Sequence, residues 1–110
     1  MNSILNSTLR DYLVGTFQDL KNKKEAEEFL KDFFSESELT SLTNRLAIGY
    51  YLRKNRSYSN IKNNLGVSSA TIATVEKQMK KKGFELALKK LEAEEWATKW
   101  SEKIKTFVKR

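Results

Sequence analysis

Between residues 57 and 83 the sequence holds five lysines and a single acid, a local net charge of +4. Ammonium groups gathered in this way bind anions, and the phosphates of nucleic acids are the commonest target. Basic domains also bind RNA or anionic membranes, so charge alone leaves the partner open. The five lysines are Lys62, Lys77, Lys80, Lys81 and Lys82, and the acid is Glu76.

Few side chains in the sequence could support catalysis or bind a metal ion. The absence of histidine and cysteine removes the commonest general base, thiolate ligands and disulfides. Four glutamates cluster near the C-terminus without metal-ligand spacing or a Gly-rich loop, and we interpret them as solvated helix faces. We therefore expect no enzymatic activity, no metal site and no cofactor. The glutamates are Glu92, Glu94, Glu95 and Glu102.

Two short helices joined at Gly66 are expected to position the lysines. In the first helix Ile61 and Leu65 lie one turn apart, and the second carries a single apolar stripe. Glycine suits a turn that needs positive φ. This pattern predicts a helix-turn-helix, with a simple helical hairpin that binds no ligand as the alternative. The stripe consists of Ile72, Val75 and Met79, and Val67 fills the turn.

The ends of the second helix also have sequence signals. Ser68 or Ser69 can accept a hydrogen bond from the first N–H groups of the helix. Gly83 stands where a glycine in the left-handed conformation would end it, and Lys80, Lys81 and Lys82 would then lie in its last turn.

The composition of the whole chain is that of one all-α domain over residues 1–110. The 110 residues include no proline and only four glycines, with abundant helix-forming residues. No stretch has the apolar length of a membrane span, and the N-terminus lacks the pattern of a signal peptide. We therefore expect a cytoplasmic protein without a membrane partner.

Helices are predicted around the motif at residues 3–21, 25–34 and 36–54, with one or two more in 84–110. The third begins with a capping box, a serine followed three residues later by glutamate, at Ser35 and Glu38. It is apolar on two sides: Leu39, Leu42, Leu46 and Tyr50 form one face, and Ile48, Tyr51 and Leu52 the other. Burial of both sides predicts a homodimer, and a central helix in a monomeric bundle is the alternative.

Two apolar stripes follow one another in residues 84–110. The tryptophans of the second stripe are interpreted as core or dimer packing and not as a platform for bases. The first stripe is Phe84, Ala87, Leu88 and Leu91, and the second is Trp96, Trp100, Ile104, Phe107 and Val108.

The segment from about Phe34 to Gly83 resembles the Trp repressor superfamily, in particular its YerC/YecD-type branch. The resemblance implies an all-α, intertwined homodimer that binds double-stranded DNA and regulates transcription, with the second motif helix in the major groove. A helical interaction module, antitoxin-like or adaptor-like, is the alternative function. The residues that carry the resemblance are Arg45-Leu46, Leu52, Lys62-Asn63, Leu65-Gly66 and Ala70-Thr71-Ile72.

The outward face of the second motif helix is expected to enter the groove. Its positions lack the Arg, Asn and Gln side chains that pair bidentately with bases, so direct readout should be thin. Phosphate contacts fall to Lys62, Lys77, Lys80 and Lys81, with Arg53, Lys54 and Arg56 as secondary candidates. The DNA-binding residues that we predict are Lys62, Ser68, Ser69, Ala70, Ala73, Thr74, Lys77 and Lys81.

The resemblance also implies that free L-tryptophan does not control this protein. Where the family carries an arginine that holds the tryptophan carboxylate, this chain has Thr74, and a family serine falls on Gln78. Thr71 matches in kind, and an arginine of the preceding helix corresponds to Arg45 or Asn44. Whether another small-molecule effector exists stays open: if this tryptophan pocket is filled at all, a different small molecule or the protein's own side chains must fill it.

Overall fold

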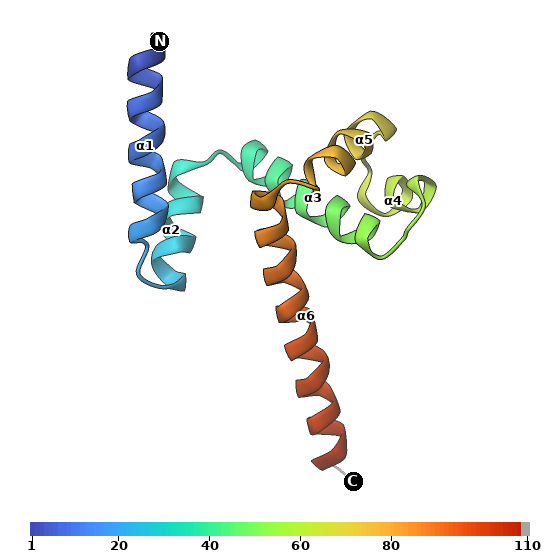
Figure 1. Cartoon of the computed structure of the whole chain (residues 1–110). Helices are drawn as coiled ribbons and strands as arrows, with labels where there is room; N and C mark the ends of the chain where they lie inside the picture. Colours follow the sequence, from blue (N-terminus) through green and yellow to red (C-terminus); the bar gives the residue numbers. More distant parts are fainter. Residues whose placement is uncertain (109–110) are drawn as a thin grey trace. The chain divides into compact units, whose positions relative to one another are not determined.

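The computed structural model describes the backbone of residues 1–108 and the side chains of residues 1–99. Within this range the chain forms six helices and no strand (Figure 1), which confirms the predicted all-α fold. It divides into two compact units, residues 1–40 and 41–110, which are described separately. The single domain expected over residues 1–110 stays a prediction.

The first unit holds helices α1 (Ser3–Asp19) and α2 (Lys23–Phe33). Each begins at an asparagine whose side chain accepts a backbone N–H: Asn2 from Leu5 at 2.7 Å and Asn22 from Glu25 at 2.9 Å. The cap at Asn22 starts α2 two residues earlier than the sequence analysis expected.

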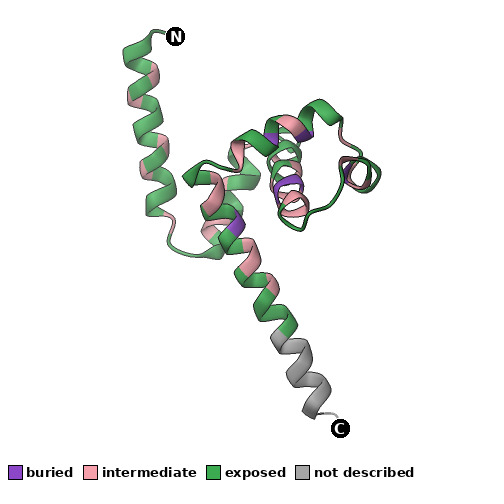
Figure 2. Ribbon diagram, turned by 45° about the vertical axis from the view of Figure 1, so that its right-hand side comes forward, coloured by how far each residue is buried: buried purple, intermediate pink, exposed green. Residues whose placement is uncertain are grey.

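Neither α1 nor α2 buries a residue completely within the chain (Figure 2). Their aromatic rings pack on one another, with Phe29 at 5.2 Å from both Phe17 and Phe33 between centroids. Gly15 of α1 makes no close contact with another helix among the described residues, because a Cβ there would meet nothing within 4 Å. Much apolar surface stays exposed, including Ile4, Leu5, Leu9, Tyr12, Val14, Phe17, Leu30 and Phe33.

Helix α3 (Glu36–Arg53) begins with the predicted capping box. The Ser35 hydroxyl accepts from the Glu38 N–H at 3.1 Å, and the Glu38 carboxylate accepts from the Ser35 N–H at 2.9 Å. The bond from the Ser35 backbone lowers the pKa of Glu38 below its usual value. This prediction is confirmed.

The core of the second unit joins α3, α4 (Tyr58–Leu65) and α5 (Ser69–Gln78). Ile48, Ile61, Ile72 and Val75 form one buried cluster. Tyr51, Leu52, Tyr58, Leu65, Val67 and Phe84 pack against it. Ile61, Ile72 and Val75 are thus buried as predicted, and Leu65 packs against the cluster. Met79, the third residue of the predicted stripe, is half-buried as the C-cap of α5.

Helix α6 (Lys82–Val108) is one continuous helix that packs on α3 through Leu88 and Phe84. The contact depends on Gly49, where a Cβ would lie 2.6 Å from Cε1 of Phe84. Trp96, the first residue of the second apolar stripe, is 64% exposed within the chain, so it is not part of the core. The side chains of Trp100, Ile104, Phe107 and Val108 lie outside the described residues.

Ion pairs also join the end of α3 to α6. Arg53 binds Glu85 through both Nη atoms at 2.8 and 2.7 Å, and its Nε lies 3.0 Å from Glu92. Lys54 lies 3.5 Å from Glu95. Glu92 and Glu95 are thus bound to α3, so their interpretation as merely solvated faces is wrong.

Glu94 pairs with Lys90 of its own helix at 2.9 Å, and the side chain of Glu102 is outside the described range. Hydrogen bonds from Lys99 and then Tyr50 lower the pKa of Glu95 to about 2. This carboxylate therefore stays ionised in its contacts with α3.

Candidate nucleic-acid interface

The turn between α4 and α5 has the geometry that its sequence predicts. Gly66 ends α4 in the left-handed conformation, at φ 66° and ψ 34°, and its N–H bonds the carbonyl of Lys62 at 2.9 Å. Ser68 begins α5 by accepting from the Thr71 N–H at 3.1 Å. Residues with a Cβ adopt such a φ at a cost, so the glycine favours this turn over a continuous helix.

The end of α5 differs from the prediction. The helix ends at Gln78 with Met79 as its C-cap, and Gly83 is the second residue of α6. Of the lysines expected in the last turn of α5, Lys80 and Lys81 lie in the connection and Lys82 begins α6. Lys77 is the basic residue of the last turn. The positive charge therefore extends beyond α5 into the connection to α6.

The predicted reading residues lie on the side of α5 away from the core. Ile72 and Val75 point inward and are buried. The helical repeat then places residues 70, 74 and 77 on the opposite side of α5. Ala73 is half-buried at the edge of this face. The other predicted DNA-binding residues are all exposed: Lys62, Ser68, Ser69, Ala70, Thr74, Lys77 and Lys81.

The electrostatics around this face favour an anionic partner. Within the described part of the chain, none of Lys62, Lys77 and Lys81 forms an ion pair. The one acid of the motif, Glu76, accepts a hydrogen bond from the Tyr58 hydroxyl at 3.1 Å. Partial burial, and then this bond, raise the pKa of Tyr58.

The secondary phosphate candidates are engaged within the chain. Arg53 and Lys54 pair with carboxylates of α6, and Arg56 donates to Asn60 at 3.2 Å and lies over the ring of Tyr51. Contact of Arg53 or Lys54 with DNA would require these ion pairs to break. In the part of the chain that the structure describes, Lys62, Lys77 and Lys81 of the motif can meet phosphates without breaking an ion pair.

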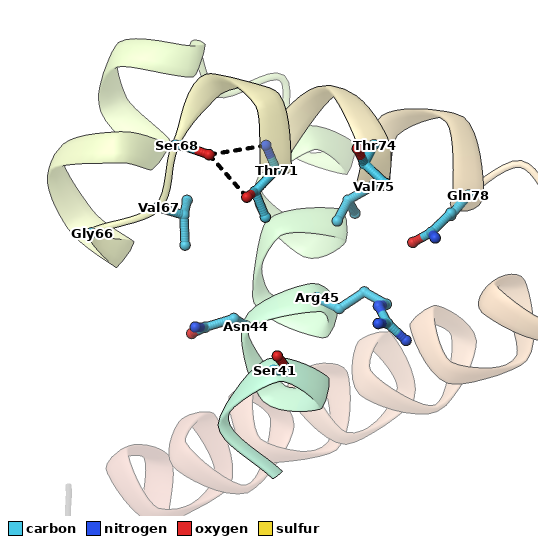
Figure 3. A pocket seen from close by; sticks show the side chains of 10 residues that line it. All are labelled: Ser41, Asn44, Arg45, Gly66, Val67, Ser68, Thr71, Thr74, Val75 and Gln78. Carbon is cyan, nitrogen blue, oxygen red and sulfur yellow. Dashed lines mark hydrogen bonds between the residues drawn. The ribbon is translucent and has the colours of Figure 1, made fainter. Parts of the chain in front are cut away.

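A pocket of about 440 Å³ lies between α3 and α5 (Figure 3). It brings together Thr71, Thr74 and Gln78 of α5 with both Asn44 and Arg45 of α3, so the two alternatives for the α3 position both line it. The sequence analysis missed Ser41, which lies one turn before Arg45 on the same helix face. The remaining lining residues are Gly66, Val67, Ser68 and Val75.

No group of three or more acidic residues, the only candidate ligands here, could hold a metal ion among the described residues. None of the helices described is both long and apolar enough to cross a membrane.

Comparison with known proteins gives two matches. The family described as "Trp repressor protein" matches residues 9–92. The uncharacterized protein YerC of Bacillus subtilis (strain 168) is 30% identical over 87 residues, which cover 77% of this chain and 84% of that relative. The family match includes the whole of α2 to α5, and with them every residue that lines the pocket between α3 and α5.

Proposed function

The chain belongs to the Trp repressor protein family, and from this premise we propose that it is a transcriptional regulator that binds duplex DNA through its helix-turn-helix. The observation that carries the proposal is the exposed face of α5, which has small side chains and lies among lysines without ion pairs in the described part of the chain. In this proposed role no residue is catalytic.

In this proposal the N-terminal part of α5 enters the major groove. Ser69, Ala70, Ala73 and Thr74 allow the backbone to approach closely and offer hydroxyl and methyl contacts to the bases. Ser68 holds the first turn, and cations on α4, in the last turn of α5 and in the connection to α6 bind phosphates and fix the position of α5. These phosphate ligands are Lys62, Lys77 and Lys81.

Lys62→Ala and Lys77→Ala test the binding mode. Each change is expected to weaken binding equally on all duplex sequences, because phosphate contacts carry no sequence information. The plot of log affinity against log salt should become shallower by about 0.9 for each phosphate that the variant no longer neutralises. Fluorescence anisotropy with random duplexes over a range of salt concentrations measures both. Lys24→Ala, which removes the same charge from α2, is the control and should leave the slope unchanged. Weak DNA binding by the wild type, with an affinity that does not change with salt concentration, would contradict the proposal.

We also propose that the functional species is a homodimer. Two observations support this: α1 and α2 bury no residue completely, and Leu42 of α3 is 38% exposed beside an apolar groove. Two helix-turn-helix motifs would then read half-sites about 34 Å apart, one turn of DNA. The other residues that line the groove are Arg45, Leu46, Gly83, Phe84 and Ala87.

Sedimentation equilibrium at micromolar concentration should give the mass of two chains, and a duplex with two half-sites should bind far more tightly than one with a single half-site. A stable monomer that binds a single half-site equally well would show that the apolar surfaces serve another purpose.

Free L-tryptophan is expected to leave DNA binding unchanged. Thr74 occupies the position on α5 at which the resemblance places a carboxylate-binding arginine. Its hydroxyl already donates to the Ala70 carbonyl at 3.0 Å. Because this hydroxyl is neutral and already hydrogen-bonded, it cannot replace arginine as the charged, bidentate partner of the tryptophan carboxylate. Calorimetric titration and DNA binding with added L-tryptophan check this. Micromolar affinity together with tighter DNA binding would contradict it.

A further inference from the structure

The pocket between α3 and α5 contains hydrogen-bond donors that have no partner among the described residues. Ser41, Asn44 and Arg45 stand at i, i+3 and i+4 on α3, so they share one helix face. In the part of the chain that the structure describes, none of their side chains forms a hydrogen bond or an ion pair. Figure 3 shows them leaving α3 beneath the side chains of α5.

The α5 side of the pocket adds further unused polar groups. The hydroxyls of Ser68 and Thr71 lie 2.9 Å apart, and because only one of their two protons is shared, the other can be donated. The amide oxygen of Gln78 is buried without a hydrogen-bond partner. A half-turn of this amide would present its NH₂ group to an acceptor instead. A buried polar atom without a partner, such as this amide oxygen, is a place where a bound group would supply the missing hydrogen bond.

The charges and apolar groups of the lining select the class of occupant. Among the described residues, Arg45 is the one cation that lines the pocket, and no carboxylate lines it. Val67 and Val75 are its only apolar side chains, whereas pockets for drug-sized ligands are mostly apolar. An oxyanion that takes several hydrogen bonds at once fits this lining better than an aromatic or aliphatic molecule does.

The position of the pocket relates it to DNA. Thr74 both lines the pocket and belongs to the exposed face of α5 that is proposed to enter the groove. A backbone phosphate of DNA bound by α5 would therefore lie near the pocket mouth.

We propose that this pocket binds a phosphate group and that Arg45 is its charged ligand. Where the phosphate is that of the DNA backbone, the inference rests on the proposed function and adds α3 to the DNA interface. A free phosphorylated small molecule carries the same group, and the test separates the two sources. Arg45 would bind two phosphate oxygens, with hydroxyl and amide donors completing the site.

The first arm of the test measures binding to random duplex DNA across a range of salt concentrations. Arg45→Gln should weaken binding roughly tenfold and make the salt slope shallower by about 0.9, because one phosphate is no longer neutralised. Arg45→Lys keeps the charge but removes the bidentate geometry, so it should keep the slope and reduce the affinity. Arg10→Gln, the same change on an exposed residue of α1, is the control. Because Arg45 is exposed, circular dichroism should show unchanged folding.

The second arm uses inorganic phosphate without DNA, titrated by calorimetry at constant ionic strength against chloride. If the pocket takes its phosphate from a free molecule, the wild type binds inorganic phosphate, Arg45→Gln does not, and Arg10→Gln does. A lower DNA affinity and a shallower slope in Arg45→Gln support the backbone as the source, and a loss of phosphate binding in the second arm supports a free one.

Unchanged behaviour of Arg45→Gln in both arms overturns the inference, as does a wild type that binds neither DNA nor phosphate. If the wild type does not bind duplex DNA but binds phosphate through Arg45, the proposed function fails while the phosphate site stands.

Discussion

Ala70→Glu is expected to reduce DNA binding at least about 100-fold without unfolding the protein. The residue is exposed in the first turn of α5, on the face proposed to enter the groove. A carboxylate there would lie among phosphates, and such juxtaposed like charges cost several kcal/mol, about a factor of ten for each 1.4 kcal/mol. The same carboxylate suits the positive end of the helix dipole, so it should slightly stabilise α5. The change therefore separates binding from folding.

Ala70→Glu is a sharper test than the same substitution at Ala73, which is half-buried, so that folding and binding would change together. Ala93→Glu introduces the same charge at an exposed position of α6 and serves as the control. Anisotropy with random and selected duplexes measures binding, and thermal unfolding followed by circular dichroism measures stability. If Ala70→Glu folds normally and binds like the wild type, α5 does not enter the groove.

Local signals in the sequence were enough to predict the centre of the motif. Gly66 adopts the left-handed conformation that its place between two helices required, and Ser68 caps α5. The buried Ile72 and Val75 follow from helical periodicity alone. In each case the interacting groups lie within about one helical turn, so a short stretch of sequence contains both partners.

The boundary between α5 and α6 could not be found in this way. Residues 79–83 are mostly lysines, which suit the end of one helix as well as the start of another. Gly83 was read as a helix terminator, yet it has no positive φ and no neighbour that would demand glycine. A glycine marks a helix end only when the backbone there turns left-handed.

Contacts between α3 and α6 also lay beyond sequence analysis. Arg53 and Glu85 are 32 positions apart, and the sequence contains many other oppositely charged residues with which each could pair. The same holds for the pocket: Ser41 and Arg45 stand out only when α5 is known to face them. Pairings between distant residues depend on helix packing, which periodicity does not determine.

Gly49→Ala is expected to lower the free energy of unfolding by about 1–3 kcal/mol, as overpacked cores do. Alanine is the better helix former, by up to about 1 kcal/mol, so packing and propensity act in opposite directions here. The new Cβ would lie 2.6 Å from Cε1 and 2.9 Å from Cζ of Phe84, closer than carbon atoms can approach. Phe84 packs against the core, so the ring or the whole of α6 must move.

Gly15→Ala is the matched control, since a Cβ there meets nothing within 4 Å and only propensity acts. It should raise stability by up to about 1 kcal/mol. Trimming the ring in the double variant Gly49→Ala/Phe84→Leu should recover part of the stability, because the two changes act on the same packing site. Urea unfolding of the wild type, both single variants at Gly49 and Phe84, and the double variant gives the coupling between the two sites. A Gly49→Ala variant as stable as Gly15→Ala would mean that α6 does not approach α3 at this glycine, and the ion pairs from Arg53 and Lys54 would then be the contacts that hold the two helices together.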